Sequence, residues 1–189
     1  MTKAELRARL RAARPDPDVI GRESRLVCQR LMSWDILRRA RIIAAYYPMP
    51  GEADITPALR DILSSGKILL LPRTGRDGNL TFCRATSLEA LEADAYGIPA
   101  PPPGAPRGDT IELMLLPLCG VDGAGHRLGH GAGCYDRDLA GRGAETLRVG
   151  VALSYQMTET MPADPWDQSL DACVCPMGII EFTGREREP

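Results

Sequence analysis

The sequence contains no long run of apolar residues, and this absence excludes a membrane-spanning helix. No apolar stretch approaches the roughly 18–20 residues that a membrane span needs. The basic start of the chain, residues 1–14, has no apolar segment behind it, so we expect no secretory signal peptide. Both observations favour a cytoplasmic protein.

The chain also lacks a large net charge. It has 23 Lys and Arg residues against 25 Asp and Glu residues, a formal net charge of −2. This balance argues against a dedicated nucleic-acid or membrane-surface binder. Residues 1–41 do carry a local excess of +6, and an RNA-binding arm is one interpretation of it. Because this segment has helical periodicity and lacks interleaved aromatic residues, we favour basic helices packed beside an anionic ligand site.

Disulfides and a zinc site are not expected either. Six cysteines are present, but without an export signal we expect them to be reduced thiols. Cys173 and Cys175 alternate along a predicted strand, and no second pair lies at a spacing suitable for zinc. With 189 residues, of which 44% are hydrophobic, the chain can bury a sizeable core without such staples. We therefore expect one domain over residues 1–189.

Two helices are predicted near the start of the chain. Thr2 and Glu5 are spaced for a capping box, in which each side chain accepts from a free backbone amide. Asp16 followed by Pro17 is a second start signal, since proline suits the first helical position. The second helix has an apolar stripe that comprises Ile20, Val27, Leu31 and Trp34.

The rest of the chain alternates apolar runs with helical segments. Strands are predicted over residues 42–47, 67–71, 80–84, 111–118, 147–153 and 172–180. Helices are predicted over residues 56–63 and 135–140, and Gly66 suits a left-handed cap after the first of them. Residues 97–109 are rich in Pro and Gly and predict an irregular connection. The alternation predicts an α/β fold, a three-layer sandwich around a largely parallel, mixed β-sheet.

A glycine-rich segment, residues 120–133, follows the most apolar strand and leads into a helix. In α/β sheets, ligands bind beyond the carboxyl ends of the strands. Glycines at 129, 131 and 133 allow backbone amides to approach a phosphate, and the next helix N-terminus favours negative charge. The spacing matches neither a P-loop nor a dinucleotide fingerprint, so a structural turn is an equally good interpretation at this point.

Charged residues around this segment favour a phosphate ligand. Arg127 and Arg137 flank the glycines and could neutralise phosphate oxygens. Asp136 could bind Mg²⁺ or cap the helix. A second acidic cluster precedes the last strand and comprises Asp164, Asp167 and Asp171. Taken singly, each acid is also compatible with a solvated loop charge.

The run RLGHGAGCYDRDLA, preceded by LLPLCGVDGAGH, resembles the signature of the 5-formyltetrahydrofolate cyclo-ligase family, also called methenyltetrahydrofolate synthetases. Shorter matches follow in the family's order: KAELR near the start, then GEAD, LPR, GIP and WDQSLD. The resemblance implies conversion of 5-formyltetrahydrofolate to 5,10-methenyltetrahydrofolate. It also implies Mg²⁺ as cofactor and ATP as co-substrate, with release of ADP and phosphate.

The resemblance assigns roles to particular residues. The implied ATP contacts are Lys3, Ala4, Glu5, Leu6 and Arg7, and Arg127, Leu128, Gly129, His130, Gly131, Ala132, Gly133, Cys134 and Tyr135. The implied folate contacts are Arg7, Tyr47, Glu52, His130, Gly131, Ala132, Gly133 and Cys134. Asp136 and Asp167 are the implied metal ligands, and Arg7 and Tyr135 the implied catalytic residues. Two alternatives stay open: Glu52 as an exposed loop acid, and Tyr135 as a ring packed under the loop.

Three positions depart from the pattern that this family usually shows. Cys134 stands where an aromatic residue is usual, Trp166 replaces a common histidine, and Cys175 lies where the last strand often carries threonine. These departures motivate an alternative hypothesis, a non-catalytic relative that binds folate or nucleotide. The expected partner is 5-formyltetrahydrofolate, which could be polyglutamylated, with no nucleic acid or membrane. We expect a monomer or a weak homodimer.

Overall fold

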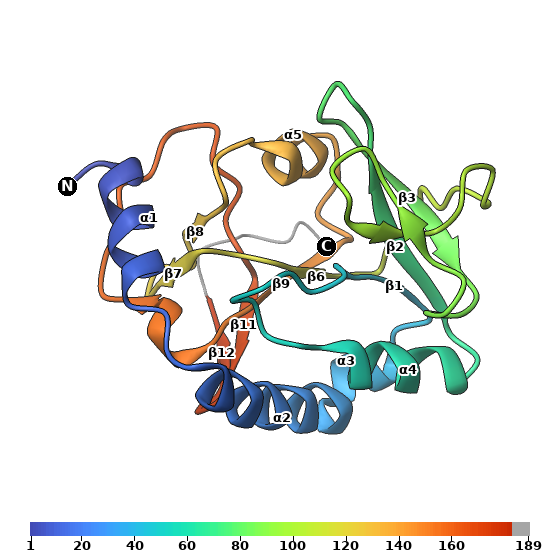
Figure 1. Ribbon diagram of the computed structural model, residues 1–189, viewed down its shortest axis with the longest axis horizontal. Helices are drawn as coiled ribbons and strands as arrows, with labels where there is room; N and C mark the ends of the chain where they lie inside the picture. The colour runs from blue at the N-terminus through green and yellow to red at the C-terminus, as the bar shows by residue number, and fades with distance from the viewer. Residues whose placement is uncertain (183–189) are drawn as a thin grey trace.

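A seven-stranded sheet with helices on both faces forms the centre of the computed structural model, which describes residues 1–182 (Figure 1). The strand order is β12-β11-β9-β6-β1-β2-β3. The strands are β1 (Ile42–Ala44), β2 (Ile68–Thr74), β3 (Leu80–Ala85), β6 (Leu113–Leu116), β9 (Leu147–Val151), β11 (Ala172–Cys175) and β12 (Gly178–Glu181). The five inner strands are parallel, and β3 and β12 pair antiparallel at the two edges. The predicted α/β fold with a largely parallel, mixed sheet is confirmed.

The apolar strands are buried by helices on both faces. Along β6, Leu113 and Leu115 pack in the core of one face, while Met114 and Leu116 pack in the core of the other. Because side chains alternate along a strand, four consecutive apolar residues supply both cores. The helices α2 (Pro17–Ser33), α3 (Asp35–Arg39) and α4 (Thr56–Ser64) cover the first face, and α5 (Cys134–Ala140) covers the second (Figure 1).

The first helix, α1 (Lys3–Ala12), packs on a small second sheet rather than on the central one. This sheet has the order β10-β7-β8 and consists of β10 (Met157–Thr158), β7 (Gly120–Asp122) and β8 (Arg127–Leu128). Leu6 and Leu10 of α1 share a core with Cys119 and Leu128. The predicted capping box is present, with Thr2 N donating to Glu5 Oε2 at 2.7 Å. These contacts fix the first turn of α1 at one edge of the molecule.

The element boundaries differ from several sequence predictions: β1 and β9 end earlier than predicted, at Ala44 and Val151, and β2 continues to Thr74. Two further differences change the topology. The predicted strand over 111–118 ends at Leu116, because the chain turns at Pro117 and enters the small sheet. The predicted strand over 172–180 is the antiparallel hairpin of β11 and β12, with Pro176 at its turn. Proline lacks the amide donor that a continuous strand would need. Gly66 follows α4 with φ +75°, as predicted.

Residues 86–110 form a long connection with little regular structure. It contains only the short antiparallel pair of β4 (Glu92–Ala93) and β5 (Pro99–Ala100). The remaining helical element is the 3₁₀ turn η1 (Ser154–Gln156). None of the helices within residues 1–182 has the length and apolarity that crossing a membrane requires.

The buried sheet predicts the effect of a core truncation. Leu115 is fully buried in β6, so we expect Leu115→Ala to lower the free energy of unfolding by about 2–5 kcal/mol. Leu26 of α2 is 43% exposed, and Leu26→Ala should change it by less than about 0.5 kcal/mol. Urea unfolding curves of the two variants would measure both effects. Equal losses would contradict the assigned core.

Candidate functional site

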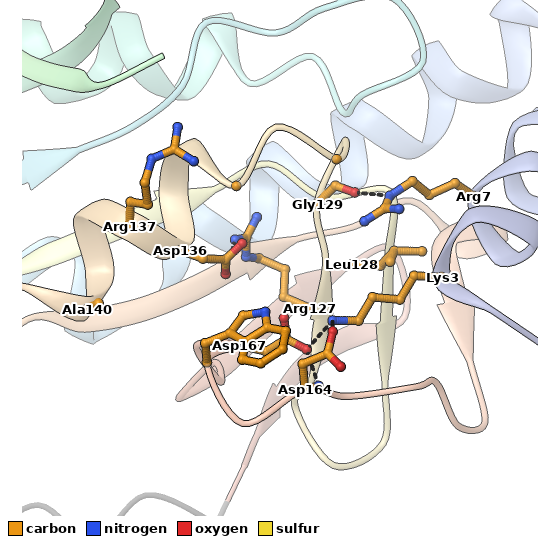
Figure 2. A pocket seen from close by; sticks show the side chains of 13 residues that line it. Lys3, Arg7, Arg127, Leu128, Gly129, Asp136, Arg137, Ala140, Asp164 and Asp167 are labelled. Carbon is orange, nitrogen blue, oxygen red and sulfur yellow. Dashed lines mark hydrogen bonds and ion pairs between the residues drawn. The ribbon is translucent and has the colours of Figure 1, made fainter. Parts of the chain in front are cut away.

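A charged cavity of about 480 Å³ lies between α1, the glycine-rich segment and α5. We call it the charged cavity; its lining residues are Lys3, Arg7, Arg127, Leu128, Gly129, Gly131, Gly133, Asp136, Arg137, Ala140, Asp164, Trp166 and Asp167. Figure 2 shows Lys3 and Arg7 reaching in from α1, with Asp136 and Arg137 on the opposite side. Four cations and three carboxylates therefore face one space. No described residue of α2 lines it, so only the first of the two basic helices lies at the site.

Lys3 joins the start of the chain to the second acidic cluster. Its ammonium donates to Asp164 Oδ2 at 2.6 Å and to Asp167 Oδ2 at 2.5 Å (Figure 2). Burial alone would lower the pKa of Lys3, but these two bonds outweigh it and hold the pKa above its ordinary value. The capping box places Lys3 in the first turn of α1, so the local helix signal also positions this charge.

Arg7, one turn further along α1, holds the glycine-rich segment. Its Nε donates to the carbonyl oxygen of Gly129 at 2.7 Å (Figure 2). Beyond this bond the backbone has φ +118° at Gly131 and φ +66° at Gly133. Only glycine adopts such angles without strain, and Gly133 is the residue from which α5 begins. The prediction of a glycine-dependent loop before a helix is confirmed, although the first part of the segment forms β7 and β8, and only residues 129–133 form the loop that leads into α5.

Arg127 is the most buried charge of the charged cavity. It is 5% exposed, and its Nη2 donates to Asp136 Oδ1 at 2.7 Å. Its guanidinium carbon lies 5.7 Å from the centre of the Tyr135 ring, within the range of a cation–π contact. Its Nε has no hydrogen-bond partner among the described residues. A buried donor without a partner is costly, so this Nε is a donor that the protein itself leaves unsatisfied.

A second, aromatic cavity of about 390 Å³ adjoins the first. We call it the aromatic cavity; it is lined by Tyr46, Tyr47, Met49, Glu52, Pro72, Thr74, Leu80, Tyr96, Ile98, Pro117, Arg127, Gly129, His130, Ala132, Gly133, Cys134, Tyr135 and Asp136. Four of these residues also line the charged cavity: Arg127, Gly129, Gly133 and Asp136. The two cavities therefore share part of one wall.

Glu52 lies in the wall of the aromatic cavity and is only 7% exposed. The alternative of an exposed loop acid is thereby excluded. Its Oε2 accepts from the amide of Met49 at 2.8 Å, and its Oε1 lies 2.8 Å from His130 Nε2. The other ring nitrogen, Nδ1, lies 3.2 Å from Cys119 Sγ. The bonds to Cys119 and Glu52 raise the pKa of His130 to about 9 against the effect of burial. At neutral pH the imidazolium therefore compensates the buried carboxylate.

A third, small cavity of about 30 Å³ lies behind this histidine. We call it the small cavity; it is lined by Leu10, Arg11, Arg14, Pro50, Gly51, Glu52, Leu118, Cys119, His130, Tyr155 and Gln156. His130 and Glu52 thus separate the small cavity from the aromatic one.

The predicted metal ligands fit Mg²⁺ by their chemistry. Asp136 and Asp167 both line the charged cavity and offer carboxylate oxygens, the donors that Mg²⁺ prefers. Within residues 1–182 no group of three or more His, Cys, Asp or Glu side chains is arranged to hold a metal. Mg²⁺ usually takes one or two protein carboxylates and completes its shell with phosphate oxygens and water. The two aspartates therefore suit a metal that arrives with a phosphate ligand.

Most of the predicted site residues line a cavity, but three do not. Ala4, Glu5 and Leu6 line neither the charged nor the aromatic cavity. Leu6 is fully buried in the core under α1, and the Glu5 carboxylate is used in the capping box. The cap at Glu5 and the buried side chain of Leu6 instead hold α1 so that Lys3 and Arg7 line the charged cavity.

Other lining residues were not assigned from the sequence. Arg137 and Asp164 had been noted for their charge alone, and their nearness to the glycines and to Asp167 was the available signal. Trp166 was noted only as a departure from the family pattern beside Asp167, and nothing in the sequence placed Tyr46 or Tyr96 at a cavity. The loop that carries Tyr96 is brought to the aromatic cavity by the β4–β5 pair.

The fold and its two adjoining cavities define a class of α/β protein with a charged and an aromatic cavity side by side at one end of a largely parallel sheet, where ligands of such sheets bind. The chain belongs to the 5-formyltetrahydrofolate cyclo-ligase family, because residues 1–176 match the sequence profile of that family. The resemblance that the glycine-rich signature indicated is therefore confirmed.

Individual relatives agree with the family assignment. The chain is 28% identical to the 5-formyltetrahydrofolate cyclo-ligase of Escherichia coli, over 94% of this chain and 100% of the relative. It is 27% identical to the protein of the same name from Saccharomyces cerevisiae, over 88% and 90%. The solved structure of Aquifex aeolicus 5,10-methenyltetrahydrofolate synthetase matches with a TM-score of 0.86 and 31% identity, over 100% of this chain and 97% of that one.

The raised pKa of His130 predicts how stability depends on pH. The folded-state pKa of about 9 lies above the ordinary value near 6.5, so the stabilisation is complete below about pH 6.5 and is lost as the pH rises through about 9. We expect the stability advantage of wild type over His130→Asn to shrink across that window in urea unfolding experiments. The imidazole contacts Glu52 and Cys119. The other titratable groups that line its two cavities are Arg11, Arg14, Tyr155, Tyr46, Tyr47, Tyr96, Arg127, Cys134, Tyr135 and Asp136. An advantage that is the same at every pH would contradict the assignment.

Proposed function

We propose that the protein catalyses the ATP- and Mg²⁺-dependent cyclisation of 5-formyltetrahydrofolate to 5,10-methenyltetrahydrofolate, with release of ADP and phosphate. The observation that carries the proposal is that the charged and aromatic cavities lie side by side, with Arg127 and Asp136 in the walls of both. A triphosphate in the first cavity and a pterin in the second would meet at these residues. The family assignment and the names of the relatives support the same reaction.

The first chemical step is a phosphoryl transfer, in which positioning and charge neutralisation supply most of the catalysis. The formyl oxygen attacks the γ-phosphorus, an O–P bond forms, and ADP leaves. Lys3, Arg7 and Arg127 supply positive charge to the phosphate oxygens, together with backbone amides of the glycine-rich segment. Mg²⁺ held by Asp136 and Asp167 would add charge neutralisation at the same oxygens.

The second step closes the ring. N10 of the folate attacks the activated formyl carbon and forms an N–C bond. The C–O bond then breaks, phosphate leaves with the former formyl oxygen, and the N10 proton is lost to this phosphate or to water. The proposed role of Tyr135 is to orient the formyl group, since its ring lies between Arg127 and the aromatic cavity. Burial raises the pKa of Tyr135 well above its usual value, so the phenol stays neutral and can donate a hydrogen bond.

The folate is held by the aromatic cavity. The Glu52 carboxylate accepts hydrogen bonds from the pterin amino and ring N–H groups, and Tyr47 packs against the ring system. His130, Ala132, Gly133 and Cys134 complete the wall on the side of the glycine-rich segment. Gly131 and Arg7 face the charged cavity, so their proposed folate contacts lie at the junction, where the formyl group meets the phosphate.

The cellular setting is also part of the proposal. All six cysteines are free, which suits a reducing cytoplasm. The folate would be accepted with one or several glutamates, and the protein would act as a monomer or weak homodimer. Lys3, Arg7 and Asp167, the charged residues that the family resemblance implies for ATP and metal binding, all line the charged cavity. Their presence favours an active enzyme over a non-catalytic relative.

The direct test mixes the purified protein with 5-formyltetrahydrofolate and MgATP and follows the methenyl chromophore. We expect turnover in wild type and a loss of about 10²-fold or more in kcat for Asp136→Asn and for Asp167→Asn, since each removes charge at the transferring phosphate. The matched control is Asp61→Asn, an exposed residue of α4 on the opposite face of the sheet. Binding of both ligands to folded wild type without turnover would favour the non-catalytic relative. Wild-type rates in either site variant would refute the metal-ligand assignment.

Glu52 predicts a separate effect on folate. Glu52→Gln keeps the shape but loses the charge and one acceptor, and it leaves the His130 imidazolium without its carboxylate. We expect the KM for 5-formyltetrahydrofolate to rise by about 10–100-fold, the cost of a lost hydrogen bond to a charged group, while the KM for MgATP changes little. Glu89→Gln, an exposed acid paired with Arg60, is the control. An equal rise in both KM values would argue against a pterin contact.

A further inference from the structure

A thiol, an imidazole and a carboxylate stand in sequence between the small and the aromatic cavities. Cys119 Sγ lies 3.2 Å from His130 Nδ1, and His130 Nε2 lies 2.8 Å from Glu52 Oε1. The three residues come from separate segments: the connection before β7, the glycine-rich segment and the loop after β1. A nucleophile, a base and a group that orients the base, each within hydrogen-bond reach, is the arrangement that activates cysteine.

Positively charged side chains lie around Cys119. His130 is protonated at neutral pH because its pKa is raised to about 9, so its Nδ1–H points at the sulfur as a donor. Arg11 and Arg14 line the same small cavity and add positive charge. Thiolates, the reactive form of cysteine, are stabilised in such electropositive surroundings.

Three other buried cysteines, Cys28, Cys83 and Cys173, lie in a different environment. Burial raises the pKa of Cys28 and Cys83, and raises that of Cys173 to about 12. Cys173 belongs to the apolar core under α5. These thiols stay protonated and inert at neutral pH, so they provide internal controls within one chain.

Access to Cys119 is narrow. The residue is 7% exposed, and the small cavity that reaches it has a volume of about 30 Å³. A space of this size holds one or two molecules as small as water. Hydrogen peroxide therefore fits, whereas bulky thiol reagents do not.

We propose that Cys119 is a modification site, a peroxide-reactive thiol activated by His130 and Glu52 and reached through the small cavity. The thiolate attacks one peroxide oxygen, an S–O bond forms, and the O–O bond breaks. Sulfur is oxidised by two electrons and peroxide is reduced to hydroxide, which takes a proton from His130 and leaves as water. The product is the sulfenic acid of Cys119, which thiols can reduce. This reactivity is separate from the proposed ligase activity and does not depend on it.

The test treats the full-length folded protein with hydrogen peroxide and then removes the oxidant with catalase. The protein is unfolded in the presence of dimedone, and peptide mass spectrometry locates the adduct on each cysteine. We expect Cys119 to be labelled at least about tenfold faster than Cys134. Cys134 is the more accessible thiol and has Arg137 Nη2 at 3.7 Å, so exposure alone predicts the opposite order. Preferential labelling of Cys134 would overturn the proposal.

Two histidine variants test whether His130 activates the Cys119 thiol. We expect His130→Asn to slow the labelling of Cys119 by about tenfold or more, because the imidazolium that stabilises the thiolate is removed. The matched control is His126→Asn, since His126 pairs with Asp122 and lines none of the three cavities. The Cys83 and Cys173 peptides report whether a variant still folds, because they should stay unlabelled in folded protein. Equal rates in the two variants, with those peptides unlabelled, would refute the role of His130.

Discussion

The charged cavity is built on the mutual neutralisation of opposite charges at short range. Lys3 lies between Asp164 and Asp167, and Arg127 is paired with Asp136. Buried or half-buried charges are tolerated only when they are paired, so the protein alone must satisfy its cations with its own carboxylates. A phosphate chain with Mg²⁺ would offer new partners to both members of these ion pairs. Phosphate oxygens would pair with the Lys and Arg side chains, and the metal would bind the carboxylates. A chain with a net charge of only −2 can therefore accommodate a strongly anionic ligand.

The parallel sheet explains how these groups come together. The glycine-rich segment and the loop after β1 both follow strands of the central sheet, and parallel strands present their carboxyl ends at the same edge. Glu52 and His130, 78 residues apart in sequence, meet there at 2.8 Å. The small sheet positions α1, because Leu6 and Leu10 of this helix pack against the apolar residues of that sheet. The apolar face of this helix thus determines where its cations lie.

The sequence was sufficient for features that are encoded locally. The capping box at Thr2 and Glu5, the positive φ at Gly66 and the buried strand around Leu115 each follow from residues close together in the chain. The hairpin at Pro176 was missed, because two short apolar strands and one long strand have the same alternation. The glycine-rich segment was identified as a candidate loop by its spacing, but its spacing alone left a structural turn equally acceptable.

Long-range pairings could not be derived from local patterns. The contact of Lys3 with Asp167 and the burial of Glu52 required the whole fold, and only the family resemblance had placed these residues at one site. The contact between Cys119 and His130 was not predicted at all, although 11 residues separate them. It arises from the antiparallel pairing of β7 with β8, and neither strand is long enough to be recognised from its sequence.

The ion pairs of Lys3 also bear on how the protein is made. Ribosomes release the amino-terminal residues first, and domains fold as their segments emerge. The partners of Lys3 lie more than 160 residues later in the chain, so its ion pairs form only after β1, β2, β6 and β9 have been synthesised. A nascent chain therefore carries a basic first helix without its acidic counterpart, and the charged cavity is complete only once translation is nearly finished.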